Sequence, residues 1–267
     1  MAILKVDTIS GIGTEGPVFE GDIEFTSQNF LTLPKGDTEQ RGRGRGMIMG
    51  GFHPAVQTME YVSIQSQGNS IAFGDMSTPT QGWGSALASS TRACIGGGGY
   101  PSNINTIEFV TIAVTSNTTN FGDLTAAKVN MGTCSSQVRG LIAGGNSTPV
   151  FFNNIDFITI ASTGDAQDFG DINNLATGVR GLSSPTRGVF AGGGTPTRLN
   201  VIDFVTIATT GNASDFGDLN VATIAAAASN NTRGIIAGGY IQPSGPVSYT
   251  HLRAHETPEQ RVLRVGG

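Results

Sequence analysis

A repeated element with an almost constant spacing is the feature that most limits what this 267-residue chain can fold into. An arginine, a small residue, an apolar run and a glycine pair recur at intervals of 47, 47, 48 and 46 residues, beginning at Arg45, Arg92, Arg139, Arg187 and Arg233. A Phe-Gly-Asp triplet keeps the same interval, at Phe73, Phe121, Phe169 and Phe216. Such periodicity is the signature of a repeat architecture, in which neighbouring units bury a common core.

Each unit predicts four short strands. RGVFAGG (187–193) is an apolar run that ends at a glycine pair, where the chain can turn freely. VIDFVTIAT (201–209) alternates in polarity and is rich in β-branched residues, which favours a half-buried strand. DFGDL (215–219) predicts an outer strand whose Phe packs between units and whose last Asp caps a turn. We assign to the end of each unit a stretch of small residues, suited to a strand crowded against its equivalents.

The composition agrees with an all-β fold. Glycine is abundant, at 39 residues, and only 13% of residues are charged, which favours tight turns and disfavours long helices. The net charge of −5 argues against a nucleic-acid partner, which would require a basic face. No apolar run is long enough to insert into a membrane. We expect Cys94 and Cys134 to be small buried side chains, because their spacing fits neither a disulfide framework nor a metal site.

The repeats resemble the kelch family of β-propellers. In that family a hydrophobic strand ends in a glycine doublet, and aromatic residues follow on the next two strands; here these are Gly192, Gly193, Phe204 and Phe216. Phe stands where kelch proteins usually have Trp. The resemblance implies a kelch-like β-propeller over residues 41–246, with four complete repeats and a partial fifth that we interpret as truncated. It implies a fold and no particular activity.

The N-terminal segment, residues 1–40, lies outside the repeats and predicts short strands. Its KVDTI (5–9), GDIEF (21–25) and LPKG (33–36) resemble the start of structural and tail-fibre proteins of tailed phages, especially marine cyanophages. The resemblance implies a segment that anchors the chain to other virion proteins.

The C-terminal segment, residues 247–267, differs sharply in composition. VSYTHLRAHET (247–257) resembles the translated sequence of an adapter used to prepare sequencing libraries. We therefore expect an artefactual tail beyond Pro246, and we assign no role to His251 or His255. A genuine divergent C-terminus is the alternative.

The sequence contains partial matches to catalytic and metal-binding motifs, but each lacks the context that its motif requires. GIGTEG (11–16) matches a dinucleotide fingerprint but is followed by Pro17 and a strand pattern instead of a helix. Asp165, Asp168 and Asp171 are spaced like calcium ligands but lack the order of an EF-hand loop. We therefore expect no catalytic residues, no metal and no cofactor.

The loop after each glycine pair is the part that varies most between repeats. Equivalent loops of a propeller lie on one face, and aromatic, amide and Arg side chains there suit contact with a sugar or a protein. The candidate binding residues are Phe52, His53, Tyr100, Phe151, Phe152, Arg198 and Tyr240. The alternative is that these loops vary because nothing constrains them.

Together these features predict a non-enzymatic protein of the phage virion, of structural or tail-fibre type, that presents a propeller face to a host-surface glycan or protein. Two alternatives remain. A cellular kelch adaptor would bind a protein partner and lack the phage-like N-terminal segment. A carbohydrate-active propeller enzyme would require charged residues converging at one channel mouth.

Overall fold

The computed structural model describes residues 44–51, 56–80, 84–99, 102–194, 196–241 and 245–246, so the predicted segments 1–40 and 247–267 lie outside it. Every regular element in this part of the chain is a β-strand, and all strand pairs are antiparallel. The expected all-β class is therefore confirmed. Among these residues there is no helix with the length and apolar character of a membrane span.

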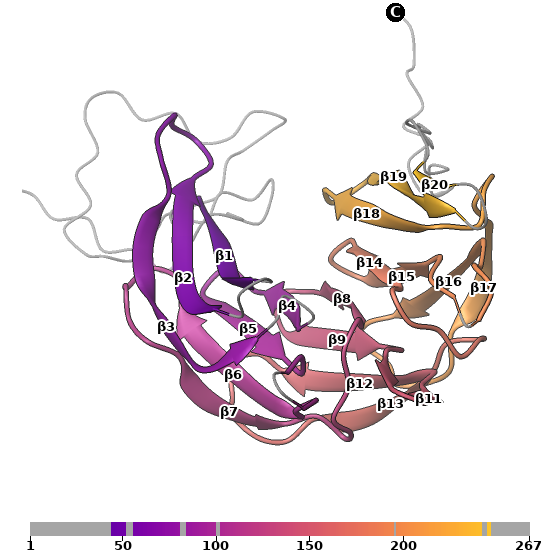
Figure 1. Ribbon diagram of the computed structural model, residues 1–267, viewed down its shortest axis with the longest axis horizontal. Helices are drawn as coiled ribbons and strands as arrows, with labels where there is room; N and C mark the ends of the chain where they lie inside the picture. Colours follow the sequence, from indigo (N-terminus) through magenta and orange to yellow (C-terminus); the bar gives the residue numbers. More distant parts are fainter. Residues whose placement is uncertain are drawn as a thin grey trace, which may run out of the picture. The chain divides into compact units, whose positions relative to one another are not determined.

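The sheets are numbered here along the chain, and the second, third and fourth have four strands each, ordered as simple meanders (Figure 1). The second sheet consists of β4 (Ser85–Ala88), β5 (Arg92–Gly96), β6 (Thr106–Thr111) and β7 (Thr119–Asp123). The third sheet consists of β8 (Gly132–Ser135), β9 (Arg139–Ala143), β12 (Asn154–Thr159) and β13 (Gln167–Asp171). The fourth sheet consists of β14 (Arg180–Ser183), β15 (Arg187–Ala191), β16 (Val201–Thr206) and β17 (Ser214–Asp218).

The first and fifth sheets have three strands each. The first consists of β1 (Arg45–Gly51), β2 (Val56–Ser63) and β3 (Ile71–Thr80). The fifth consists of β18 (Ile224–Ser229), β19 (Gly234–Ile241) and β20 (Gly245–Pro246). A separate hairpin is formed by β10 (Asn146–Ser147) and β11 (Val150–Phe151). Within the described ranges, no strand of the first sheet pairs with a strand of the fifth.

The small-residue strands begin the sheets, which corrects the unit boundary expected from the sequence. β4, β8, β14 and β18 each pair with the next strand along the chain, which begins at or directly after the repeated arginine. They also contact one another from sheet to sheet: Thr133 Oγ1 donates to the Ala86 carbonyl oxygen at 2.6 Å, and Ser135 Oγ to that of Ala88 at 2.7 Å. The expected crowding is confirmed, because a side chain in place of Gly181 would overlap the backbone of Thr133.

In the second and third sheets, which have a neighbouring sheet on each side, the third strand is covered on both faces. In β6 and β12 adjacent residues are buried, including Glu108 and Asp156 beside Ile107 and Ile155. The sequence pattern predicted a half-buried strand, and this was wrong for the second and third sheets. Alternation in polarity cannot distinguish a solvated face from one on which a neighbouring sheet satisfies the buried carboxylate.

The Phe-Gly-Asp triplet forms a β-bulge at the outer edge of each four-stranded sheet. In the second sheet, Ile107 pairs with Gly122 and Glu108 with Asn120, so Phe121 is the extra residue and turns inward. The Asn120 side chain accepts a hydrogen bond from the Gly122 N–H at 3.0 Å. The capping role expected for the last residue of the triplet therefore belongs to the residue before the Phe, here and at Asp168 and Asp215.

The repeated arginine joins each of the first three sheets to the next. The Arg92 guanidinium lies 4.4 Å from the centre of the Phe109 ring, and its Nη1 donates to the Ile160 carbonyl oxygen of the third sheet at 3.0 Å. Phe109 in turn meets Phe121 edge to face, with ring centres 5.9 Å apart. Arg45 and Arg139 donate equivalent hydrogen bonds to carbonyl oxygens of the sheets that follow theirs, those of Ile112 and Ile207. An arginine is required because its planar cation stacks on the ring while its N–H groups remain free to donate.

Candidate functional site

The loops with the candidate binding residues are positioned by the glycine pairs. Gly97 and Gly144 have φ angles of 65° and 66°, a conformation that favours glycine. A Cβ on Gly144 would lie 2.6 Å from the Ala176 carbonyl oxygen, which belongs to the connection that leads into the next sheet. Gly145 N–H donates to that same oxygen at 2.8 Å. In the second, third and fourth sheets the glycine pair therefore holds its loop against the neighbouring sheet, at the end of the second strand.

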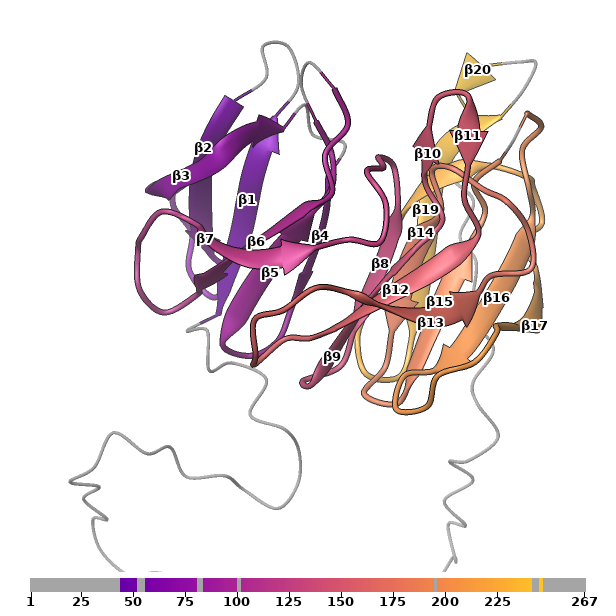
Figure 2. The ribbon, with the colours of Figure 1, turned by 90° about the horizontal axis from the view of Figure 1, so that it is seen from below.

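In the third sheet this loop forms the β10–β11 hairpin, which projects beyond the ends of β9 and β12 (Figure 2). Val150 and Phe151, which form its second strand, are 52% and 36% exposed. The ring of Phe152, the next residue, is half-buried and lies 5.5 Å from Lys128 Nζ. The hairpin thus combines an exposed apolar strand with an aromatic ring over a cation at its end.

Asn146, at the base of the hairpin, links the loops of successive sheets. Its Oδ1 accepts hydrogen bonds from Thr177 Oγ1 at 2.7 Å and from Asn130 Nδ2 at 3.3 Å. Asn103, in the loop of the second sheet, donates to Ser147 Oγ at 3.2 Å. Amide and hydroxyl groups of two loops and two inter-sheet connections therefore form one polar network, which limits the freedom of the hairpin.

Three of the seven predicted binding residues are described in full. Phe151 and Phe152 share the hairpin, and Arg198 is half-buried in the corresponding loop of the fourth sheet, where it forms a bridge with Gly194. Phe52, His53, Tyr100 and the side chain of Tyr240 lie outside the described residues. The convergence of all seven on one surface therefore stays a prediction.

A buried ion pair under this hairpin was missed by the sequence reasoning. Lys128 and Asp156 have side chains that are 0% exposed, and Lys128 Nζ lies 3.2 Å from Asp156 Oδ2. Burial lowers the pKa of Lys128, and the nearby carboxylate opposes that change. Asn154 Oδ1 accepts from Nζ at 3.1 Å, and Thr125 Oγ1 donates to Asp156 Oδ1 at 2.6 Å. The available signal was that Lys128 is the single lysine between residues 45 and 246.

The same strand position has a buried acid in the second and fourth sheets. Glu108 accepts from the Ser77 N–H at 3.1 Å and from Thr118 Oγ1 at 2.6 Å, and the Ser77 hydroxyl also donates to it. Asp203 accepts from the Asn173 N–H at 3.0 Å. Burial raises the pKa of Asp203, while the bonds from Asn173 oppose that change. Glu108 thus binds the outer strand of the preceding sheet, and Asp203 binds the segment that follows it.

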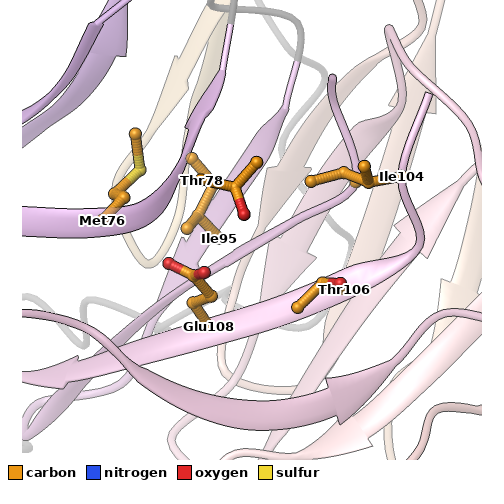
Figure 3. A pocket seen from close by; sticks show the side chains of 7 residues that line it. Met76, Thr78, Ile95, Ile104, Thr106 and Glu108 are labelled. Carbon is orange, nitrogen blue, oxygen red and sulfur yellow. The ribbon is translucent and has the colours of Figure 1, made fainter. Parts of the chain in front are cut away.

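Small cavities adjoin these acids. One lies between the first and second sheets, beside Glu108, Thr78 and Ile104 (Figure 3), and has a volume of about 10 Å³. A second one, beside Asp203 in the fourth sheet, has the same volume. A water molecule needs about that much space, whereas small-molecule sites measure roughly 300–1,000 Å³. Neither cavity can hold a substrate.

Other reactive groups are dispersed or buried in the described residues. No group of three or more His, Cys, Asp or Glu side chains is placed there to hold a metal ion. Asp165 and Asp168, considered above as calcium ligands, accept hydrogen bonds from two different backbone N–H groups, those of Asp123 and Gly170. Cys94 and Cys134 are free and buried, as expected, and burial raises the pKa of the Cys94 thiol to about 12.

Comparison with known proteins adds no assignment to these observations. No model of a protein family matches the chain, and no curated protein matches it significantly. The functional interpretation therefore depends on the repeat pattern, the sheets and the loop geometry.

Proposed function

We propose that this chain is part of a kelch-like β-propeller in a non-enzymatic protein of the phage virion, of structural or tail-fibre type, and that the loops after the glycine pairs form its recognition surface. The sheets are the blades, with four complete repeats and a partial fifth. The N-terminal segment anchors the propeller to other virion proteins. The partner at the loop surface is a glycan or protein of the host cell surface.

The β10–β11 hairpin is the observation that supports this role best. Its second strand presents Val150 and Phe151 to solvent, while its first strand is held by the network around Asn146. An exposed aromatic side chain on a constrained loop loses little conformational freedom on binding and offers a flat surface for a sugar ring or a protein. A loop that varied without constraint would not require this network.

The test is to replace Phe151 with Ala and to measure binding of the protein to intact host cells and to an array of surface glycans. The matched control is Val138→Ala, an equally apolar change at a residue that is 61% exposed and precedes β9, whereas the hairpin follows β9. We expect Phe151→Ala to lose most of the binding and Val138→Ala to keep it, with both melting temperatures near that of the wild type. Full binding by Phe151→Ala would contradict the recognition role of the hairpin.

A further inference from the structure

The three junctions between consecutive sheets, from the first to the fourth, use one set of complementary contacts. The leading sheet contributes what we call the tail, which consists of its repeated arginine, its Phe-Gly-Asp bulge and a polar residue shortly after the bulge, such as Thr125. The following sheet contributes what we call the head. The head consists of the isoleucine at the end of the alternating strand, such as Ile160, the turn after it, and the acid on that strand, such as Asp156. At the junction of the second and third sheets, Gly164 N–H donates to the Phe121 carbonyl oxygen at 2.7 Å, and Asp123 N–H donates to Asp165 Oδ1 at 3.0 Å.

The first sheet has a head with no partner among the described residues. Ile64 follows β2, the strand of the first sheet that is equivalent to β6, β12 and β16. It is 73% exposed, whereas its equivalents Ile112, Ile160 and Ile207 are 5%, 1% and 2% exposed. Ile48 is 51% exposed, and its equivalents Ile95 and Ile142 are 6% and 1% exposed. The acid Glu60 is also exposed; it accepts from Ser70 Oγ at 2.7 Å, as Glu108 does from Thr118, but lacks the bonds that Ser77 gives to Glu108.

The fourth sheet has the corresponding tail with its outer part uncovered. Phe216 is half-buried, whereas Phe73, Phe121 and Phe169 are each 3% exposed. A Cβ on Gly217 would meet nothing within 4 Å, although one on Gly122 or Gly170 would overlap the turn of the following sheet. Asn220 is exposed, while its equivalents Ser77, Thr125 and Asn173 bind the acid of the next sheet.

We propose that the head of one copy of this chain docks on the tail of a second copy. The repeat register assigns the contacts. Asn220 of the tail binds Glu60 of the head, and Arg187 donates to the carbonyl oxygen of Ile64. Asp218 N–H donates to the side chain of Asn69. Ile64 is buried beside Phe216, so the interface extends a contact that the chain already makes three times.

The second copy must share the tail with the fifth sheet, and the repeat makes this feasible. Ile236 of β19 packs against the fourth sheet in a cluster with Leu219, in the place that Ile48 of the second copy would take. β1 (RGMIMGG) and β19 (RGIIAGG) are copies of one element. β1 of the second copy therefore replaces β19 beside β18, and β18 with the incoming β1, β2 and β3 completes a four-stranded sheet. Because β1 and β19 share one sequence pattern, β18 keeps a paired edge when one replaces the other.

The head and tail are different surfaces, so the association is heterologous. A pair of chains joined in this way still has one free head and one free tail, and growth continues as the concentration rises. This inference does not depend on the proposed recognition role.

Sedimentation of the full chain over a concentration series tests the proposal. The tail variant is Asn220→Glu, which places a second negative charge opposite Glu60, and the head variant is Ile64→Arg; both residues are exposed, so each variant should fold. We expect the average mass of the wild type to rise beyond that of a dimer, and each variant to remain a monomer. An equimolar mixture of the two should double in mass and stop there, because only one intact head meets one intact tail.

Charge reversal and a matched control complete the design. The double variant Glu60→Lys/Asn220→Glu should regain the association of the wild type. Val114→Arg changes a 62% exposed residue in the corresponding turn of the second sheet, which belongs neither to the free head nor to the free tail, and should associate like the wild type. A wild type that stays monomeric at every concentration, a single variant that still associates, a mixture that stays monomeric, or loss of association in Val114→Arg would each overturn the proposal.

Discussion

The junction after the second sheet and the uncovered end of the fourth sheet contain the same residue types but differ in burial. Within each sheet the arginine lies over an aromatic ring, at 4.4 Å for Arg92 and 4.7 Å for Arg187. The two aromatic rings are 5.9 Å apart in both sheets. Yet Phe121 is buried and Phe216 only half-buried. The repeated residues thus determine the arginine–aromatic geometry within a sheet, whereas the burial of the Phe-Gly-Asp phenylalanine depends on the sheet that follows.

Truncating the two phenylalanines should give the largest contrast. Phe121→Ala removes a fully buried ring and should lower the free energy of unfolding by about 3–5 kcal/mol, because a cavity remains between two sheets. Phe216→Ala should cost about half as much, since part of that ring already contacts water. Denaturant unfolding followed by circular dichroism measures both values. Equal losses would show that the fourth sheet is covered in solution.

The bulge glycines should give the second contrast. Gly122 and Gly217 have φ angles of 150° and 136°, so an Ala at either position carries a similar backbone strain. Only at Gly122 would the new Cβ also overlap the turn of the next sheet. We expect Gly122→Ala to be less stable than Gly217→Ala by about 1–3 kcal/mol, the usual cost of overpacking. Thermal melts of the two variants should separate accordingly; coincident melts would contradict the close approach.

The arginines should give a smaller contrast. Arg92→Ala loses the contact with Phe109 and the hydrogen bond to the Ile160 carbonyl oxygen, whereas Arg187→Ala loses only the contact with its own ring among the described residues. We expect a difference of about 1 kcal/mol in unfolding free energy, the usual net value of one intramolecular hydrogen bond. A double-mutant cycle with Phe109→Leu should separate the ring contact from the hydrogen bond. If both arginines cost the same, the inter-sheet bond contributes nothing.

The smallest effect should be in the pH dependence of stability. Burial raises the pKa of Asp203 above its ordinary value of 3.8, so the folded protein retains this proton where the unfolded chain has released it. The stabilising contribution of this group is therefore complete below pH 3.8 and is lost as the pH rises through the folded-state pKa. We expect the stability of the wild type relative to Asp203→Asn to fall over that window in melts at stepwise pH. Glu60→Gln, at the equivalent exposed position, controls for the loss of one carboxylate, and a pH-independent difference for Asp203→Asn would refute the assignment.

Much of the fold was predictable because the strand signals are local. The apolar runs before the glycine pairs, the β-branched alternation and the Phe-Gly-Asp triplet form three successive strands, as expected. The corrected unit boundary makes them the second, third and fourth strands of a sheet. The paired aromatic residues also meet, as Phe157 and Phe169 show at 5.9 Å. The candidate site was less predictable. Phe151 and Phe152 lie on the expected loop, but the Asn146 network and the Lys128–Asp156 pair join residues from different repeat elements.

By itself, the sequence determined the all-β class, the repeat interval and the types of strand. It could not determine which neighbour each strand joins, because a strand with two free edges can pair with the strand before it or with the one after it. The tertiary structure decided that the small-residue strands open the following sheets and that Asp156 is buried with Lys128. It also decided that Phe216 is less buried than Phe121, although both occur in the same triplet. Burial and charge pairing depend on what a neighbouring sheet places against a residue, and a motif read within one strand does not contain that information.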